Sequence, residues 1–330
     1  MEQTLLLSDD QVRQATDMVT MVDAIEAALA ESPGPQLVPP RPGLTAEGTF
    51  FRLAPAMLSH AGVLGLKLMH GSFEQGVRYL VILCDITTGA VTTVLDAAYL
   101  TGARTGATSG VATRRLARAD ATSVGIIGAG LEAGTNLAAV AAVRPIERVK
   151  VFSPREFRRV AFAERMRAEL GIEVEPADTA QAAVGGADVV IAATNTGADG
   201  PVALRGEWLE PGQHVVSIGS TMPGRRELDV AAFARADAVF FDGPAESVAD
   251  ESGDIRAWRE RDPAAVAAVP TLTDLLRTEI PGRRRAEDIT VFKSIGAAAQ
   301  DLAAAVVVAK TAQAKEIGTR VPGLAALKTF

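Results

Sequence analysis

Residues 123–133 read SVGIIGAGLEA, an apolar run followed by a glycine-rich turn. The run has the composition of a buried strand, and the turn has the spacing G-x-G-x-x-A of a dinucleotide-binding loop. The first glycine allows the tight turn, and the second lets backbone N–H groups approach a pyrophosphate at the start of a helix. The alternative is a glycine-rich turn in an α/β domain that binds no nucleotide. We expect dinucleotide contacts from Gly128, Gly130, Leu131 and Glu132.

Strands and helices alternate after this loop. Helical segments such as 131–143 and 156–170 separate apolar segments at 149–152, 172–174, 187–194, 214–218 and 238–242. Strands separated by helices of about 10–15 residues form parallel sheets. The fold class is therefore predicted as α/β, with a Rossmann-type, doubly wound parallel sheet over residues 120–290.

The flanking segments follow another pattern. Residues 50–96 contain apolar runs separated by Gly-rich turns, which is typical of antiparallel hairpins. Residues 97–119 and 297–314 are rich in small residues and helical, and Ser8 and Thr20 are expected to begin two N-terminal helices. We therefore expect a discontinuous α+β domain, residues 1–119 plus 291–330, into which the Rossmann domain is inserted.

Composition excludes several classes of function. The chain has 330 residues, with 33 Lys and Arg against 40 Asp and Glu, so a nucleic acid or an anionic membrane is not the expected partner. We find neither an apolar run of about 18 residues nor a signal peptide, and expect a soluble, cytoplasmic protein. One cysteine and three histidines without ligand spacing predict no metal site. The basic run 283–285 is expected to be a solvated loop.

The end of the second Rossmann strand affects the choice of cofactor. NAD-preferring sites usually place a carboxylate there, whereas this chain has Ser153 and Arg155. A serine can donate to a 2′-phosphate, and an arginine can pair with it through charge-assisted hydrogen bonds. We expect NADP(H) in preference to NAD(H). The alternative is a solvated basic helix start, with NAD(H) as the cofactor.

Several motifs in the chain resemble the ornithine cyclodeaminase/mu-crystallin family. They lie at residues 65–67, 101–109, 128–130, 217–229, 251–254 and 291–296. The resemblance implies a homodimer whose terminal domain forms the interface and the substrate cradle. It also implies nicotinamide chemistry on the C–N bond of a small amino or imino acid. Members include cyclodeaminases, alanine dehydrogenases, ketimine reductases and opine-type synthases.

The resemblance assigns the substrate carboxylate to Lys67 and Arg104, with Arg41 as a third member. An ammonium and a planar guanidinium can orient a carboxylate while a hydride passes to the adjacent carbon. Lys67 can also protonate the substrate nitrogen, and His70 is a second candidate for that proton. The alternatives are a snorkelling strand lysine, a helix-surface arginine and a strand-end histidine. For the cofactor, the expected contacts are Thr105, Thr194, Asn195, Gly219 and Lys293.

Two departures from the family pattern bear on the reaction. Thr221 stands where cyclodeaminases carry an acidic residue, and a hydroxyl is far too weak a base to replace it. Arg52 stands where the family has a second acid. The added positive charge suggests a substrate with more than one carboxylate; the alternative is an ion pair with Glu74 or Asp85.

We therefore expect an NAD(P)H-dependent oxidoreductase that reduces an α-imino (ketimine) acid or oxidises an α-amino acid, with Lys67, Arg104 and Thr221 at the reacting group. One alternative is an ornithine cyclodeaminase-type lyase that keeps NAD bound. Another is a non-catalytic protein that binds a dinucleotide and sequesters a small ligand.

Overall fold

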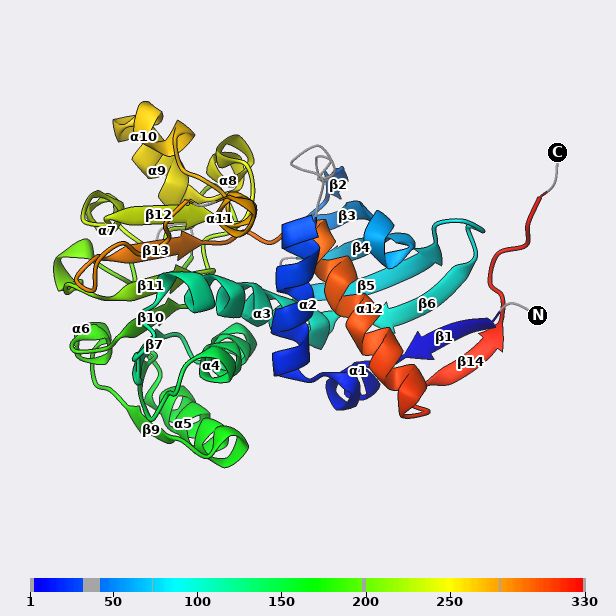
Figure 1. Cartoon of the computed structure of the whole chain (residues 1–330), viewed down its shortest axis with the longest axis horizontal. Coiled ribbons are helices and arrows are strands. Elements are labelled where there is room, and N and C mark those ends of the chain that lie inside the picture. The colour runs from blue at the N-terminus through cyan, green and yellow to red at the C-terminus, as the bar shows by residue number, and fades with distance from the viewer. Residues whose placement is uncertain (1–2, 32–41, 73, 198–199, 279, 329–330) are drawn as a thin grey trace. The chain divides into compact units, whose positions relative to one another are not determined.

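A computed structural model of the protein describes residues 3–31, 42–72, 74–197, 200–278 and 280–328. It divides into two compact units, Met1–Arg104 with Ala297–Phe330 and Thr105–Gly296 (Figure 1). The sequence placed the first boundary at 119/120, whereas the structure divides within helix α3 (Ala98–Leu116). The carbonyls in the last turn of α3 accept hydrogen bonds from arginine side chains of the second unit, which explains why this end of the helix belongs to that unit.

The first unit contains a sheet in the order β14-β1-β6-β5-β4-β3-β2. Neighbouring strands are antiparallel except β1 and β6, which are parallel. The predicted hairpins are therefore confirmed. The strands are β1 (Gln3–Leu7), β2 (Gly43–Ala46), β3 (Thr49–Leu58), β4 (Val63–Ser72), β5 (Gly76–Asp85), β6 (Val91–Asp96) and β14 (Thr319–Pro322), with the 3-10 turn η2 (Ser59–Ala61) after β3.

Helices α1 (Asp9–Ala15), α2 (Met18–Glu31) and α12 (Ala298–Ala314) belong to the same unit, and α12 packs against α2, β3, β4 and β5 (Figure 1). Ser8 caps α1 as expected. The prediction for Thr20 was wrong, because Asp17 accepts the backbone N–H of Thr20 at 2.8 Å and α2 begins one turn earlier. The sheet face under α12 is mostly apolar, with buried side chains that include Leu5, Leu7, Ala54, Val81, Leu83 and Leu95.

The second unit contains a wholly parallel sheet in the order β12-β13-β11-β10-β7-β8-β9. Its first five strands follow the Rossmann order, since β9, β8, β7, β10 and β11 are neighbours in that sequence. The predicted fold class is confirmed. The strands are β7 (Ser123–Ile127), β8 (Arg148–Phe152), β9 (Glu173–Pro176), β10 (Val189–Ala192), β11 (His214–Ser217), β12 (Ala238–Phe241) and β13 (Thr290–Lys293).

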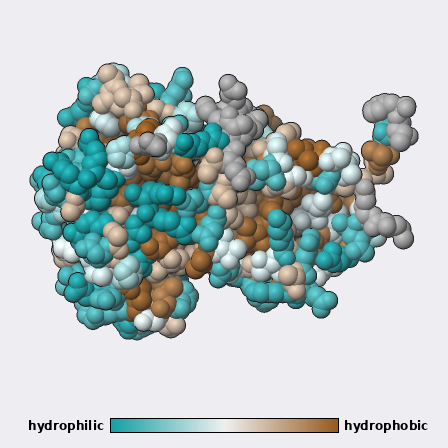
Figure 2. All heavy atoms as spheres, in the orientation of Figure 1, coloured by the Kyte–Doolittle hydropathy of each residue, from teal (hydrophilic) through white to brown (hydrophobic). Residues whose placement is uncertain are grey.

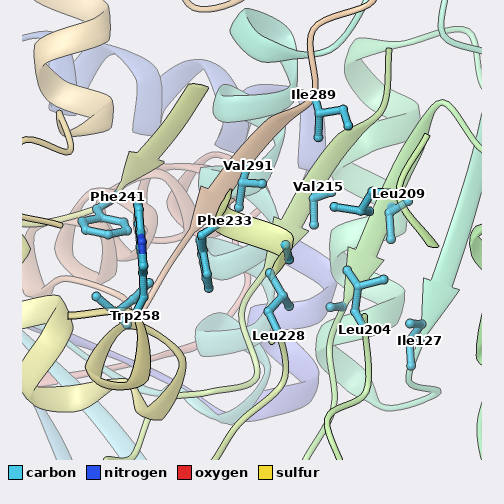
Figure 3. Packing of buried hydrophobic residues seen from close by; sticks show 14 of the residues in the cluster. Ile127, Leu204, Leu209, Val215, Leu228, Phe233, Phe241, Trp258, Ile289 and Val291 are labelled. Atoms are coloured by element: carbon cyan, nitrogen blue, oxygen red, sulfur yellow. The ribbon is translucent and has the colours of Figure 1, made fainter. Parts of the chain in front are cut away.

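The helices of the second unit cover this sheet and enclose its core. They are α4 (Leu131–Val143), α5 (Glu156–Leu170), α6 (Ala180–Val184), η3 (Gly206–Trp208), α7 (Val230–Ala234), α8 (Ala245–Glu251), α9 (Gly253–Arg261), α10 (Pro263–Ala267) and α11 (Leu272–Arg277). One apolar cluster gathers side chains of β10, β11, β13, α7 and α9 (Figure 3). Within it the rings of Phe233 and Trp258 stack with centroids 4.8 Å apart.

Two arginines of the second unit hold the C-terminus of α3. Arg144 donates to the carbonyls of Thr113, Arg114 and Ala117 at 2.9–3.0 Å. Arg283 donates to the carbonyl of Leu116 at 2.8 Å. Thr113 also accepts the N–H of Ala117 at 3.0 Å, whereas the last carbonyls of a helix lack partners inside it, and a cation there also compensates the helix dipole. The prediction of a solvated loop at 283–285 was therefore wrong for Arg283, whereas Arg284 and Arg285 are exposed.

In the described part of the chain, no helix is long and apolar enough to cross a membrane. On the face drawn in Figure 2, polar and apolar side chains are mixed over both units. Large hydrophobic side chains that are exposed lie mostly in the first unit, among them Leu44, Phe51, Met57 and Val77.

His214 provides a test of the Rossmann core. Its side chain is fully buried, and Nδ1 lies 2.9 Å from Thr290 Oγ1. Burial, with smaller effects from the charges of Arg283 and Arg144, lowers the pKa of His214 to about 3. Since the unfolded chain then takes up the proton first, this residue's contribution to stability is full above its ordinary pKa and is lost as the pH falls toward the folded value.

We expect the His214→Asn variant to be less stable at neutral pH but to lose less stability on acidification. The difference in slope approaches about 1.4 kcal/mol per pH unit. Urea unfolding at pH 7, 6 and 5 measures it, with the exposed His60→Asn as the control. Identical slopes for the wild type and His214→Asn would contradict the assignment.

Candidate functional site

Lys67 lies in the middle of β4, on the sheet face that α12 covers. Its cross-strand partners are Ala54 on β3 and Val81 on β5, both fully enclosed. Lys67 itself is 3% exposed, so its ammonium group lies within an apolar layer. An uncompensated charge at such a depth is costly, and a counter-charge is needed.

Asp301, on the first turns of α12, supplies that counter-charge. Its Oδ1 accepts a hydrogen bond from Lys67 Nζ at 2.8 Å and one from Arg104 Nε, also at 2.8 Å. The three side chains are 4%, 7% and 2% exposed for Lys67, Arg104 and Asp301. Two cations and one anion leave one positive charge. The structure thus brings the two expected carboxylate-binding residues together, and it adds an aspartate that the sequence analysis missed.

The other residues expected around the substrate are distributed differently. Arg52 pairs with Met69 and is half-buried, and the alternation of β3 and β4 places it on the same face as Lys67. His70 lies three residues beyond Lys67 and pairs with Phe51, so it lies on the opposite face. The structure does not bring His70 and Lys67 together. Arg41 lies outside the described residues.

The glycine loop after β7 has the geometry that a dinucleotide needs. Gly128 has φ of +122°, and a Cβ there would lie 2.1 Å from the carbonyl oxygen of Ala193. Gly130 is the N-cap of α4, and the nearest atom to a Cβ there would be Glu132 Oε2, 3.8 Å away. The N-terminus of α4 is therefore open to an anion such as a pyrophosphate. Leu131 is half-buried and Glu132 is exposed, as the first two residues of the helix.

The end of β8 presents the expected pair of residues at different depths. Ser153 is 8% exposed, and its carbonyl accepts a hydrogen bond from Arg159 at 3.2 Å. Arg155 is exposed and is the N-cap residue of α5. The exposed guanidinium is thus available to a phosphate near the buried serine.

Glu227 joins the carboxyl ends of β10 and β11. It is 1% exposed, and its carboxylate accepts four hydrogen bonds. The donors are the N–H and hydroxyl of Thr194, the hydroxyl of Ser217 and the N–H of Gly219, at 2.6–2.8 Å. A dinucleotide on a Rossmann sheet passes the carboxyl ends of the strands. Glu227 therefore sets the backbone at the edge where the sequence predicted Thr194 and Gly219 as contacts.

A second buried carboxylate, that of Asp254, holds the backbone of Glu227 in place. Asp254 accepts the N–H groups of Glu227 and Leu228 at 2.7 and 3.1 Å, and it lies 3.8 Å from Lys293 Nζ. Burial raises the pKa of Asp254 to about 6, against the opposing effect of Lys293. Lys293 is 0% exposed and donates to Ser217 at 3.2 Å. The ammonium of Lys293 is thus enclosed, and its hydrogen bond to Ser217 connects it to the expected cofactor edge.

The loop after β11 is held tightly at its base and exposed at its tip. A Cβ at Gly219 would lie 2.2 Å from the carbonyl oxygen of Thr194 and 2.3 Å from Glu227 Oε1, so only glycine fits. Thr221, at the tip, is exposed. Asn195 is also exposed, and its side-chain oxygen accepts a hydrogen bond from Arg225. Thr105, the residue after Arg104 on α3, is buried, and its carbonyl accepts a hydrogen bond from Ser109 at 3.1 Å.

Among the described residues, no group of three or more His, Cys, Asp or Glu side chains could hold a metal ion.

We expect Glu227→Gln to weaken dinucleotide binding and to destabilise the protein. All four partners of the carboxylate are donors, and an amide nitrogen in place of one oxygen would leave at least one of them without an acceptor. The loss is about 1–3 kcal/mol for each donor left unsatisfied. Affinity for NADH, measured by fluorescence titration, should fall about tenfold or more, with a lower Tm.

Glu207→Gln is the matched control, because Glu207 is exposed and its carboxylate accepts a hydrogen bond from Arg205 at 3.4 Å. If Glu227→Gln bound NADH as the wild type and Glu207→Gln do, the assignment of Glu227 to the dinucleotide edge would be wrong.

Known proteins resemble this chain over its full length. An alanine dehydrogenase of Archaeoglobus fulgidus is 32% identical over 97% of this chain and 98% of its own. A Delta(1)-pyrroline-2-carboxylate reductase of Bacillus cereus is 31% identical over 96% of this chain and 99% of its own.

Solved structures give the same result. The Delta(1)-pyrroline-2-carboxylate reductase of Thermococcus litoralis, in complex with NADH and L-proline, has a TM-score of 0.89 at 31% identity, covering 96% and 100% of the two chains. An archaeal alanine dehydrogenase dimer with bound NAD has a TM-score of 0.87 at 30% identity, covering 97% and 99%. The iminosuccinate reductase of Paracoccus denitrificans, in complex with NAD+, has a TM-score of 0.86 at 27% identity, covering 97% and 100%.

The model of the ornithine cyclodeaminase/mu-crystallin family matches residues 2–316. With the motifs, the two folds and these relatives in agreement, the chain belongs to the ornithine cyclodeaminase/mu-crystallin family.

Proposed function

We propose that the protein is a nicotinamide-dependent oxidoreductase that reduces the C=N bond of an α-imino acid and oxidises the corresponding α-amino acid. The observation that carries the proposal is the buried cluster of Lys67, Arg104 and Asp301, with one net positive charge. Such a cluster suits one carboxylate. The names of the similar proteins support it, since they act on pyrroline-2-carboxylate, iminosuccinate or alanine.

The residues of this chain divide the work of reduction. Reduction adds a hydride to the carbon of C=N and a proton to its nitrogen. Lys67 and Arg104 bind the substrate carboxylate and orient the adjacent carbon. The glycine loop, the start of α4 and the edge set by Glu227 hold the dinucleotide, with Thr105 and Thr194 among its contacts. When bound, the nicotinamide supplies or accepts the hydride.

The proton on nitrogen is assigned to Lys67. Of the expected donors, Lys67 lies in the carboxylate site, whereas His70 lies on the opposite face of the sheet. Thr221 is exposed, and its hydroxyl can orient a water but is a poor acid. A cyclodeaminase needs an acid–base group at that position, so the structure favours reduction or oxidation over deamination with ring closure.

We also propose that the protein is a homodimer that associates through its first unit. The exposed large hydrophobic side chains of that unit include Leu44, Phe51, Met57 and Val77. Apolar surface of this kind is typical of an interface. The archaeal alanine dehydrogenase, which is similar over 97% of this chain, is a dimer.

The first experiment is a spectrophotometric panel with NADPH and NADH in parallel. The substrates are Delta(1)-pyrroline-2-carboxylate, pyruvate with ammonia, and iminosuccinate, which is included because Arg52 shares the face of Lys67. We expect oxidation of the cofactor by at least one imino acid. In the Lys67→Met variant kcat/KM should fall about 100-fold or more, because the carboxylate loses its charge partner and the substrate its orientation.

Lys310→Met is the control, since Lys310 is exposed on α12. L-Ornithine with NAD+ tests the lyase. Release of ammonia and proline from ornithine, without reduction of any imino acid, would contradict the proposal. Dinucleotide binding without turnover of any panel member would show a binding protein instead.

For the cofactor, we propose a preference for NADP(H), supported by the buried Ser153 and the exposed Arg155 at the end of β8. Ser153→Asp places a carboxylate beside the 2′ position, where it accepts from a ribose hydroxyl and repels a phosphate. We expect the ratio of kcat/KM for NADPH to that for NADH to fall about 100-fold or more. Arg148→Ala, at the other end of the same strand, is the control. A wild-type preference for NADH would overturn the assignment.

A further inference from the structure

Asp301 occupies a position that the expected chemistry of the site leaves unexplained. The carboxylate of a substrate is held by cations, yet the structure places a fixed carboxylate between those same cations. Asp301 is 2% exposed and reaches Lys67 across 234 residues of chain and Arg104 across 197. Such a group either competes with the substrate or prepares the site for it.

The geometry favours preparation. A single oxygen, Oδ1, accepts from both Lys67 Nζ and Arg104 Nε. Arg104 makes this contact through its inner nitrogen, Nε, and its Nη1 donates a second hydrogen bond to Gln300 Oε1 at 3.1 Å. Gln300 is held in turn by the N–H of Ala297 at 3.2 Å. Two consecutive residues of α12 thus fix the plane of the guanidinium, which a bidentate contact with a carboxylate requires.

The charges around Lys67 lead to the same conclusion. Arg104 comes from α3, Arg52 shares the sheet face on β3, and the ring of Tyr79 on β5 lies 5.7 Å from Nζ. Against these positive charges, Asp301 on α12 is the carboxylate that the structure places in hydrogen-bond contact with both Lys67 and Arg104. Without it, the two buried cations would repel each other.

We propose that Asp301 is a positioning residue for recognition of the substrate carboxylate. It holds Lys67 and Arg104 at one point and offsets one of their two positive charges. This inference rests on the proposed function, because it concerns the same site. Asp301 does not take part in hydride or proton transfer.

Asp301→Asn tests the inference, since the variant keeps the side-chain oxygen and the shape but removes the charge. The readout is selectivity: kcat/KM for Delta(1)-pyrroline-2-carboxylate divided by kcat/KM for Delta(1)-pyrroline, the same ring without the carboxylate. We expect this ratio to fall about tenfold or more, mainly through KM for the imino acid.

Two further variants separate positioning from folding. Asp10→Asn, at an exposed aspartate of the same unit, should leave the ratio unchanged. Asp301→Glu restores the charge on a longer arm, and the ratio should stay low because the two cations are displaced. An equal loss of kcat/KM for both rings in Asp301→Asn would show a merely structural role and overturn the inference. Tighter binding of the carboxylate substrate would show a competitor and overturn it as well.

Calorimetry with L-proline and pyrrolidine, in the presence of NADP+ or NAD+, measures the same selectivity without turnover. If the wild type selects L-proline and Asp301→Asn selects it equally well, this inference is wrong while the proposed function stands. If the wild type neither reduces any imino acid nor binds L-proline or L-alanine, the proposed function is wrong and the inference falls with it.

Discussion

Lys67, Arg104 and Asp301 carry full charges at side-chain exposures of 7% or less, and this buried cluster constrains the first unit. Burial of one ion costs several kcal/mol unless partners and hydrogen bonds compensate it. The compensation requires β4, α3 and α12 to meet at one point, although they are far apart in sequence. Replacing the cluster with apolar side chains would meet the needs of folding equally well. Its presence in an apolar layer is therefore better explained by ligand binding than by stability.

The second unit meets a comparable constraint with the signs reversed. Glu227 and Asp254 are two buried carboxylates opposite one ammonium, that of Lys293. Here the partners of the two carboxylates are mostly backbone N–H groups and hydroxyls. The cluster therefore fixes the backbone at the ends of strands, and it does not position a cation for a ligand. The shared network explains why residues 217–229, 251–254 and 291–296 all carry motifs of the same family. The three segments meet around Glu227, and each contributes a member of the network.

Local patterns predicted the elements of this chain better than its site. Strand β7 and helices α4 and α5 begin and end at the predicted residues, because glycine and polar residues mark their ends within a few positions. Thr20 was misassigned because Asp17, three residues earlier, is the stronger cap. Asp301 was missed because its partners lie 197 and 234 residues away, and no spacing rule connects them. Arg283 was misjudged because its partners are carbonyls, which the sequence does not distinguish.

The remaining question is how Thr221, in place of the acidic residue of cyclodeaminases, fits the proposed reaction. Deamination with ring closure needs a group that removes and returns protons at a nitrogen, and a threonine hydroxyl cannot do this near neutral pH. Hydride transfer to an existing C=N bond needs an oriented carbon, one proton and a dinucleotide. In the proposed function, the buried cluster provides the orientation, Lys67 supplies the proton, and the carboxyl edge of β10 and β11 holds the dinucleotide. The missing acid belongs to a step that the proposed reduction does not contain, so Thr221 agrees with the proposed reaction.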